Sequence, residues 1–343
     1  MMRVICTAGL SVIALLAPPL QDRSALMAFR VDDQRVVASV RELLDPIPQF
    51  KEGQGTQTAA KYGYPFLDLP EALRMRVPPE IKVGDRWAVH TAPGQVFQAT
   101  AERFVLGQGQ CSSMLGLVLR IDDQDATAFA GVRTKYYVAD TRSAGSGGTE
   151  STLGPLPMST ITPEVRARLE ASLAQVFALE LPRVRAETAK SIVAMAASDV
   201  GYHRAWARDR QNVEAALARG AGVLAYDAQP FRLTPDGVPH VFVRAQWRVG
   251  SRPGFAASFW IRWDTGAIVW KNVNPASWLR MFEFQGEIDT TQLGLVLNVI
   301  DRDRNGWAEL IFLQAGYESI GVSLYTISSS GFTPAGISYA YGC

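Results

Sequence analysis

Residues 223–272 read VLAYDAQPFRLTPDGVPHVFVRAQWRVGSRPGFAASFWIRWDTGAIVWKN, and this stretch decides the fold class. Its strand-like runs are rich in β-branched and aromatic residues, and the turn sequences Pro235-Asp236-Gly237 and Asp264-Thr265-Gly266 lie between them. Turns this short join strands that are neighbours in one sheet. The sequence therefore predicts an antiparallel meander with strands at Val223–Leu233, Val241–Val249, Ala256–Trp263 and Ala267–Asn272.

Runs with the same strand character lie on both sides of the meander. The downstream runs are Leu293–Ile300, Trp307–Gln314 and Val322–Ile327, followed by a turn at Ser329-Ser330-Gly331. The upstream runs are Trp87–His90, Val96–Val105, Met114–Ile121 and Phe129–Val138. Because turn-forming residues separate the upstream runs, we predict an antiparallel sheet in the N-terminal part as well.

The clearest helix signal begins at Thr162. Thr162-Pro163-Glu164 supplies an N-cap, a proline at the first helical position and an acid in the first turn. The apolar residues that follow at helical spacing are Val165, Leu169, Leu173, Val176 and Phe177. Pro182 should interrupt this helix, because proline cannot donate a backbone hydrogen bond. Further helical segments are predicted over Val184–Met195 and Arg204–Leu217, and one short helix over Phe29 to about Leu44.

The Gly/Ser/Thr run from Ser143 to Gly154 has the composition of a flexible linker, because it cannot bury apolar surface. We predict an α+β fold, mostly antiparallel β with a central helical segment. Its expected parts are a signal peptide or anchor at 1–28, an N-terminal β-rich domain at 29–142, a flexible linker at 143–160, a helical segment at 161–222 and a C-terminal antiparallel β domain at 223–343.

The N-terminus has the plan of a secretory signal peptide. Arg3 precedes an uncharged run from Val4 to Leu16, which is shorter than a membrane span requires. The sequence therefore predicts export to the periplasm, the cell surface or the medium. An uncleaved membrane anchor stays open as the alternative, because Pro18 directly after Ala17 makes a poor cleavage site.

Composition limits the classes of partner. Lys plus Arg number 34 and Asp plus Glu number 33, so the chain has no net positive field with which to neutralise phosphates. This balance argues against nucleic acid as a partner. After removal of a signal peptide only Cys111 and Cys343 remain, and in an oxidising compartment they can form a disulfide; two unpaired thiols are the alternative.

One motif indicates a specific chemical role, that of a metal-binding loop: Asp301-Arg302-Asp303-Arg304-Asn305-Gly306-Trp307-Ala308-Glu309. Calcium takes about six to eight oxygen ligands, and a short loop supplies them when carboxylates or amides alternate with other residues and a glycine permits a sharp turn. The predicted calcium ligands are Asp301, Asp303 and Asn305, the backbone carbonyl of Trp307, and Glu309.

The helix-flanked EF-hand is excluded, because its twelfth position requires a bidentate Glu and Phe312 stands there. An acid at the ninth position with a strand on each side resembles the strand–loop–strand calcium sites of the FG-GAP or integrin-α-type repeats. The resemblance covers only Leu295 to Gln314. Those families stack several such units into a propeller, and this sequence carries one copy, so the resemblance implies a calcium loop and not a propeller.

A metal-free turn is the alternative for the same loop. Arg302 and Arg304 reduce its formal charge from −3 to −1. Asp, Asn and Gly are also ordinary turn residues, so backbone hydrogen bonds alone can maintain such a hairpin. Both interpretations stay open at this point.

The sequence does not indicate an enzyme. His90, His203 and His240 stand at no metal-ligand spacing. The segment around Cys111 superficially resembles that of papain-type proteases, but Met114 stands where that family has its nucleophile. We therefore expect an exported, non-enzymatic protein with a structural or binding role, stabilised by calcium, whose protein or glycan ligand the sequence does not identify. An exported hydrolase with scattered site residues is the alternative.

Overall fold

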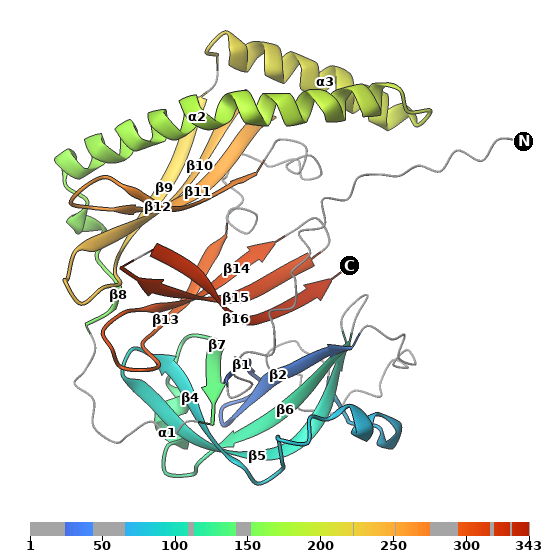
Figure 1. Cartoon of the computed structure of the whole chain (residues 1–343), viewed down its shortest axis with the longest axis vertical. Helices are drawn as coiled ribbons and strands as arrows, with labels where there is room; N and C mark the ends of the chain where they lie inside the picture. Colours follow the sequence, from blue (N-terminus) through green and yellow to red (C-terminus); the bar gives the residue numbers. More distant parts are fainter. Residues whose placement is uncertain are drawn as a thin grey trace, which may run out of the picture.

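The computed structural model describes residues 25–43, 66–108, 113–141, 152–221, 223–250, 252–274, 294–315, 319–329 and 331–342. The protein is β-rich with mostly antiparallel sheets, which confirms that part of the prediction. Figure 1 shows its elements stacked in layers, from two long helices through two sheets to a barrel. We call the sheet beneath the helices (β8 to β12) sheet B and the next one (β13 to β16) sheet C.

The barrel forms the layer farthest from the helices. Its strands are β1 (Ala25–Arg30), β2 (Arg35–Leu43), β4 (Arg86–Ala92), β5 (Gln95–Gln108), β6 (Ser113–Ile121) and β7 (Tyr136–Asp140), and β3 (Phe66–Asp68) is added to the edge of β5. The order β5-β4-β7-β1-β2-β6 closes on itself, because β6 also pairs with β5. A 3-10 helix (Glu71–Arg76) and the short helix α1 (Ala126–Ala130) complete this part.

The helix predicted from Phe29 to Leu44 is wrong, because β1 and β2 occupy this stretch. Both faces of β1 are buried: Leu26 and Ala28 face the barrel interior, while Ala25 and Met27 pack against sheet C. A strand buried on two sides lacks the alternation of polar and apolar residues that marks a half-exposed strand. The strand predicted at Phe129–Val138 is also partly wrong, since α1 ends at Ala130 and β7 begins only at Tyr136.

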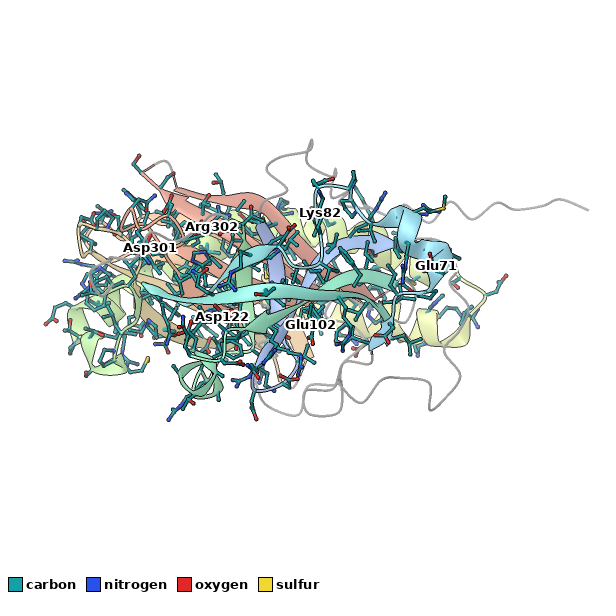
Figure 2. The ribbon with its side chains drawn as sticks, turned by 90° about the horizontal axis from the view of Figure 1, so that it is seen from below. Glu71, Lys82, Glu102, Asp122, Asp301 and Arg302 are labelled. Carbon is teal, nitrogen blue, oxygen red and sulfur yellow. The ribbon has the colours of Figure 1, made fainter. Side chains whose placement is uncertain are left out.

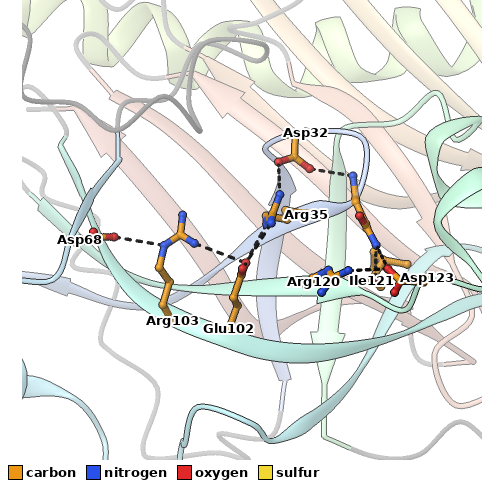
Figure 3. Close-up of polar contacts among 9 residues, drawn as sticks. Asp32, Arg35, Asp68, Glu102, Arg103, Arg120, Ile121 and Asp123 are labelled. Carbon is orange, nitrogen blue, oxygen red and sulfur yellow. Dashed lines mark hydrogen bonds and ion pairs between the residues drawn. The ribbon is translucent and has the colours of Figure 1, made fainter.

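Figure 3 shows the charged side chains near the turn between β1 and β2. The guanidinium of Arg35 lies 2.8 Å from Glu102 and 3.2 Å from Asp32, and further pairs join Arg103 to Asp68 and Arg120 to Asp123. These side chains are 28–79% exposed, so water screens the pairs and each contributes at most about 1 kcal/mol. We therefore regard this network as solvated surface.

Sheet B is the predicted meander. Its strands are β8 (Gly154–Pro155), β9 (Val223–Arg232), β10 (Pro239–Val249), β11 (Arg252–Arg262) and β12 (Ile268–Asn274), in the order β12-β11-β10-β9-β8. Every strand from β9 to β12 pairs antiparallel with its neighbour in sequence, which confirms the prediction from residues 223–272.

Two helices cover one face of sheet B. Helix α2 (Pro163–Ala196) begins at the predicted cap, where the Thr162 hydroxyl accepts the N–H of Val165, and α3 (Gly201–Ala218) packs beside it. A single 3-10 turn (Met158–Thr160) precedes them. Apolar residues of α2 pack against the alternating apolar residues of β10 and β11 in one core. This burial holds the helices on the sheet.

The interruption predicted at Pro182 does not occur, because α2 continues through it to Ala196. Proline removes one backbone hydrogen bond, at a cost of about 3 kcal/mol in a helix interior. Val176 and Val184 are both buried against sheet B, and Glu180 forms ion pairs with Lys271 of β12 and with Arg183. The packing of Val176 and Val184 and the pair with Lys271 are tertiary contacts on both sides of Pro182, and they maintain the helix.

Sheet C lies between sheet B and the barrel. Its strands are β13 (Leu295–Ile300), β14 (Glu309–Ala315), β15 (Ser319–Ser328) and β16 (Gly331–Gly342), paired in sequence order. Leu310 and Phe312 face sheet B and pack with Phe242 and Trp260, whereas Ile311 faces the barrel strand β1. Strand β14 is therefore buried on both faces.

Several predictions concern residues outside the described part of the chain. These are residues 1–24 of the signal peptide or anchor, the Cys111–Cys343 bridge and residues 143–151 of the linker, whereas residues 25–28 lie in β1. The division into domains also stays a prediction. No helix in the described ranges combines the length and the apolar character that a membrane span requires.

Candidate functional site

The predicted calcium loop connects β13 to β14 as a hairpin. This confirms that strands flank the loop, as the sequence predicted, and Ile300 and Glu309 pair at its base. The loop also contacts the segment between β9 and β10, because the N–H of Ala308 donates to the carbonyl of Leu233 at 2.8 Å. In Figure 2, Asp301 and Arg302 lie together near one end of the view, away from Glu71 and Lys82. The loop is thus placed where layers of the fold meet.

Asp301 organises the loop backbone. Its side chain is buried, and its two carboxylate oxygens accept the N–H groups of Asn305 at 3.1 Å and of Gly306 at 3.2 Å. Burial raises the pKa of Asp301, and the nearby Asp303 raises it further, while the backbone donors lower it. A cation near this carboxylate would relieve both unfavourable effects.

The sharp turn depends on two residues with positive φ. Arg304 has φ 56° and Gly306 has φ 80°, which is the left-handed region that glycine adopts without strain. A Cβ atom at Gly306 would lie 3.2 Å from the Cβ atom of Pro235, which is close for two carbon atoms. The glycine expected from the motif is therefore required by backbone conformation and by contact with the β9–β10 segment.

Asp303 and Asn305 form the exposed side of the loop, and Trp307 is half-buried against the core. The amide Nδ2 of Asn305 donates to Asp303 at 2.8 Å, and the N–H of Trp307 donates to Asn305 Oδ1 at 2.7 Å. The structure thus brings Asp303 and Asn305 together, and Asp301 approaches them through the loop backbone. Each of these acceptor oxygens has a second lone pair that can serve a cation.

Glu309 contacts Arg302, whereas in a calcium loop it would bind the ion. One carboxylate oxygen accepts the N–H of Arg302 at 2.8 Å, and the other lies 3.2 Å from Arg302 Nε. The second contact is ionic, because its geometry is not that of a hydrogen bond. Burial raises the pKa of Glu309, while the charge of Arg302 lowers it. Glu309 is therefore already compensated by a cationic side chain of the loop.

The sequence did not predict the polar cluster beneath the loop. His90 of β4 lies 3.4 Å from Asp140 of β7, and both side chains are buried. A proton on His90 would lower the pKa of Glu309. Asn298 of β13 donates to the backbone carbonyls of Thr91 and Tyr136 in the barrel, at 2.8 Å and 3.0 Å. No sequence signal links these residues, because β4, β7 and β13 are far apart in the chain.

The residues present fit a hard cation in part. Asp301, Asp303 and Asn305 offer oxygens at alternate positions of one turn, which suits calcium. Glu309 is committed to Arg302. Within the described ranges, no three His, Cys, Asp or Glu side chains gather closely enough to hold a metal ion. A calcium ion here would depend on amide, backbone and water oxygens in addition to two carboxylates, so the five-residue ligand set stays a prediction.

The surroundings of His203 and His240 bear on whether either histidine could act as a catalytic group. His203 lies 2.7 Å from the Ser198 hydroxyl, but this hydroxyl also accepts the N–H of Val200 just before α3. The contact therefore belongs to the turn that leads into the helix. His240 is buried against the ring of Phe332, and burial lowers its pKa, so it is held neutral within the core. Among the described residues, neither environment combines a nucleophile, a base and an oxyanion site.

Comparison with known proteins identifies no relative: no family model, no curated protein and no solved structure matches this chain. The resemblance of residues 295–314 to FG-GAP or integrin-α-type loops accordingly stays a prediction.

Proposed function

We propose that this chain is an exported, non-enzymatic protein with a structural or binding role, and that a calcium ion in the loop between β13 and β14 stabilises it. The α+β description with a central helical segment belongs to the same proposal. The two long helices stand in sequence between the barrel and most of sheet B, and they cover a sheet face without contributing to the loop.

The observation that carries the proposal is the position of the loop between layers. Ala308 donates to the carbonyl of Leu233, Gly306 packs on Pro235, and Asn298 of β13, the strand that leads into the loop, donates to barrel carbonyls. An ion that ordered this loop would strengthen the contacts among sheet B, sheet C and the barrel. Its effect would therefore appear in the stability of the whole fold.

Calcium-dependent unfolding tests the proposal. If calcium binds only the folded state, a concentration one hundred times the dissociation constant should raise the free energy of unfolding by about 2.7 kcal/mol. Asp303→Ala should remove most of this gain. Asp123→Ala is the matched control, because Asp123 is also an exposed, paired carboxylate but lies in the barrel. A calcium titration without a shift in melting temperature, or an equal shift in Asp303→Ala, would reduce the loop to a turn.

Export is supported by the N-terminal sequence alone. Deletion of residues 3–17 should leave the protein in the cytoplasm, because the charged and apolar parts of the signal would both be lost. Fractionation of cells that express the full and the shortened chain checks this. Equal export of both forms would contradict the signal interpretation and leave the calcium proposal unaffected.

A further inference from the structure

A cavity of about 560 Å³ opens where the barrel, sheet B and sheet C meet. Its wall consists of the end of β4 (Ala92) and the turn after it (Pro93), the start of β8, side chains of β9 and β10, and strand β13. This volume lies within the range of about 300–1,000 Å³ that is typical of small-molecule sites. Sites of that kind also occur preferentially where separate structural units join.

The wall of this junction cavity is mostly apolar. Pro93, Phe231, Phe242, Leu295 and Val296 supply aromatic and aliphatic surface. An apolar wall of this kind favours a ligand whose body is also apolar, because binding removes both surfaces from water. The polar groups of the wall then decide which functional group the ligand carries.

Two of the three polar side chains in the wall are engaged within the protein. The amide Nδ2 of Asn298 donates to two barrel carbonyls, and its Oδ1 accepts the N–H of Val299. The amide Nε2 of Gln229 donates to the carbonyl of Leu156 at 3.1 Å. These groups fix the shape of the cavity and leave the third side chain, Arg244, as the principal donor.

Arg244 has one donor without an acceptor. Its Nε and Nη2 both bond the carboxylate of Asp227 on the neighbouring strand β9. Its Nη1 is buried and has no hydrogen-bond partner within the described part of the chain. The hydroxyl of the fully buried Ser258, opposite Arg244 on β11, also has no partner within the described residues, but Ser258 does not line the cavity and adds nothing to the ligand assignment. Unsatisfied buried donors are rare in native proteins and need an explanation, for which a bound acceptor is sufficient.

The charge of Arg244 is already neutralised by Asp227. Arg244 is the only charged side chain that the described residues contribute to the cavity wall. A ligand anion would add an uncompensated negative charge next to this neutral pair and against apolar surface, which is unfavourable. An uncharged acceptor such as a carbonyl oxygen would satisfy the Nη1 donor without that cost.

We propose that the junction cavity binds an uncharged, largely apolar small molecule, and that a carbonyl oxygen of this ligand accepts a hydrogen bond from Arg244 Nη1. The apolar body lies against Phe231, Phe242 and Val296. This site is separate from the calcium loop, so each proposal can fail without the other.

Fluorescent probes test both the cavity and the ligand chemistry with the full chain. Prodan, an uncharged naphthyl ketone, should bind at one site with a blue-shifted emission. Anilinonaphthalene sulfonate, an anion of similar size, should bind at least about ten-fold more weakly, which corresponds to about 1.4 kcal/mol. Equal or tighter binding of the anion would overturn the assignment of an uncharged ligand.

Two substitutions locate the site. Arg244→Lys keeps a positive charge for Asp227 but removes Nη1, so prodan should bind about ten-fold more weakly. Arg262→Lys is the matched control, because Arg262 also pairs with carboxylates on sheet B but does not line the cavity. Ala92→Phe should abolish prodan binding by filling the cavity, with an unchanged melting temperature as evidence that the fold is intact.

The proposal is overturned if wild-type protein does not bind prodan at a single site. It is also overturned if folded Ala92→Phe binds prodan normally, or if Arg244→Lys and Arg262→Lys behave alike. If Ala92→Phe does not fold, Val296→Phe fills the same cavity from β13 and serves in its place.

Discussion

The carboxylate of Glu309 binds Arg302 twice, through the backbone N–H at 2.8 Å and across 3.2 Å to the side-chain Nε. Both side chains are largely buried, with exposures of 6% for Glu309 and 15% for Arg302. The second and ninth residues of the loop are therefore joined at its base. This contact holds the loop on the hairpin whether or not a metal ion is present.

Glu309→Gln should be strongly destabilising. The amide keeps the shape of the side chain but leaves the Arg302 charge without its counter-ion, and breaking a buried pair costs about 3–5 kcal/mol. We expect the lower end of this range, because Arg302 keeps some exposure. Denaturant unfolding measures the loss. Glu71→Gln, which breaks the exposed pair with Arg74, should cost at most about 1 kcal/mol. Equal costs would show that the pair at the loop base is solvated.

Gly306→Ala should destabilise the protein more than Gly237→Ala does. Both glycines have φ above 70°, so each substitution forces alanine into the left-handed region at about 1–2 kcal/mol. Only at Gly306 does the new Cβ atom approach a neighbour, Pro235, whereas Gly237 has open space. The difference between the two free energies of unfolding isolates the loop contact. A larger loss at Gly237 would contradict the described position of the loop.

Asp236 should make stability depend on pH in the acid range. Hydrogen bonds from Thr234, Arg262 and the N–H of Val238 lower its pKa from 3.8 to about 2. Because the pKa is lower in the folded protein, its stabilising effect is present above pH 3.8 and is lost as the pH falls toward 2. The side chain is 43% exposed, so after screening we expect no more than about 1 kcal/mol.

Asp236→Asn should therefore flatten the pH dependence of unfolding between about pH 4 and pH 2. Asp123→Asn provides a matched control on an exposed carboxylate that also pairs with arginine. The measurement is the denaturant midpoint across this pH range. An unchanged slope in Asp236→Asn would refute the role given to its hydrogen bonds.

Leu169→Ala should cost about 2–5 kcal/mol, because Leu169 is 2% exposed in the core between α2 and sheet B. Leu179→Ala, in the same helix at 63% exposure, should change stability by less than about 0.5 kcal/mol. Thermal unfolding of the two variants distinguishes them. Similar losses would mean that α2 does not present the described face to the sheet.

Sequence patterns correctly predicted those elements that depend on interactions between residues close together in the chain. The meander from residue 223 to 272 and the hairpin around the loop were predicted because short turns bring neighbouring strands together. The start of α2 was predicted because a cap, a proline and an acid act within one turn. In the candidate site, the nine residues of the loop were likewise sufficient to predict the spacing of Asp301, Asp303 and Asn305 and the need for Gly306.

Two of the failures have a common cause in burial by distant parts of the chain. Strands β1 and β2 were mistaken for a helix because β1 and the 36–38 part of β2 are buried on both faces, so their apolar residues do not alternate with polar ones. Pro182 was expected to interrupt α2 because the packing of Val184 on sheet B and the ion pair of Glu180 with Lys271 were not visible locally. The pairing of Glu309 with Arg302 was missed because motif spacing favoured a metal ligand.

The sequence by itself determined the antiparallel β character, the capped helix and the turn geometry of residues 301–309, since these follow from dihedral preferences and hydrogen bonds between residues close in the chain. Only the tertiary structure decided that β5 and β6 close a barrel, that Asn298 joins sheet C to β4 and β7, and that Arg244 lines a cavity between layers. The physical reason is that burial and charge compensation depend on which distant surfaces meet, and no spacing along the chain specifies those contacts.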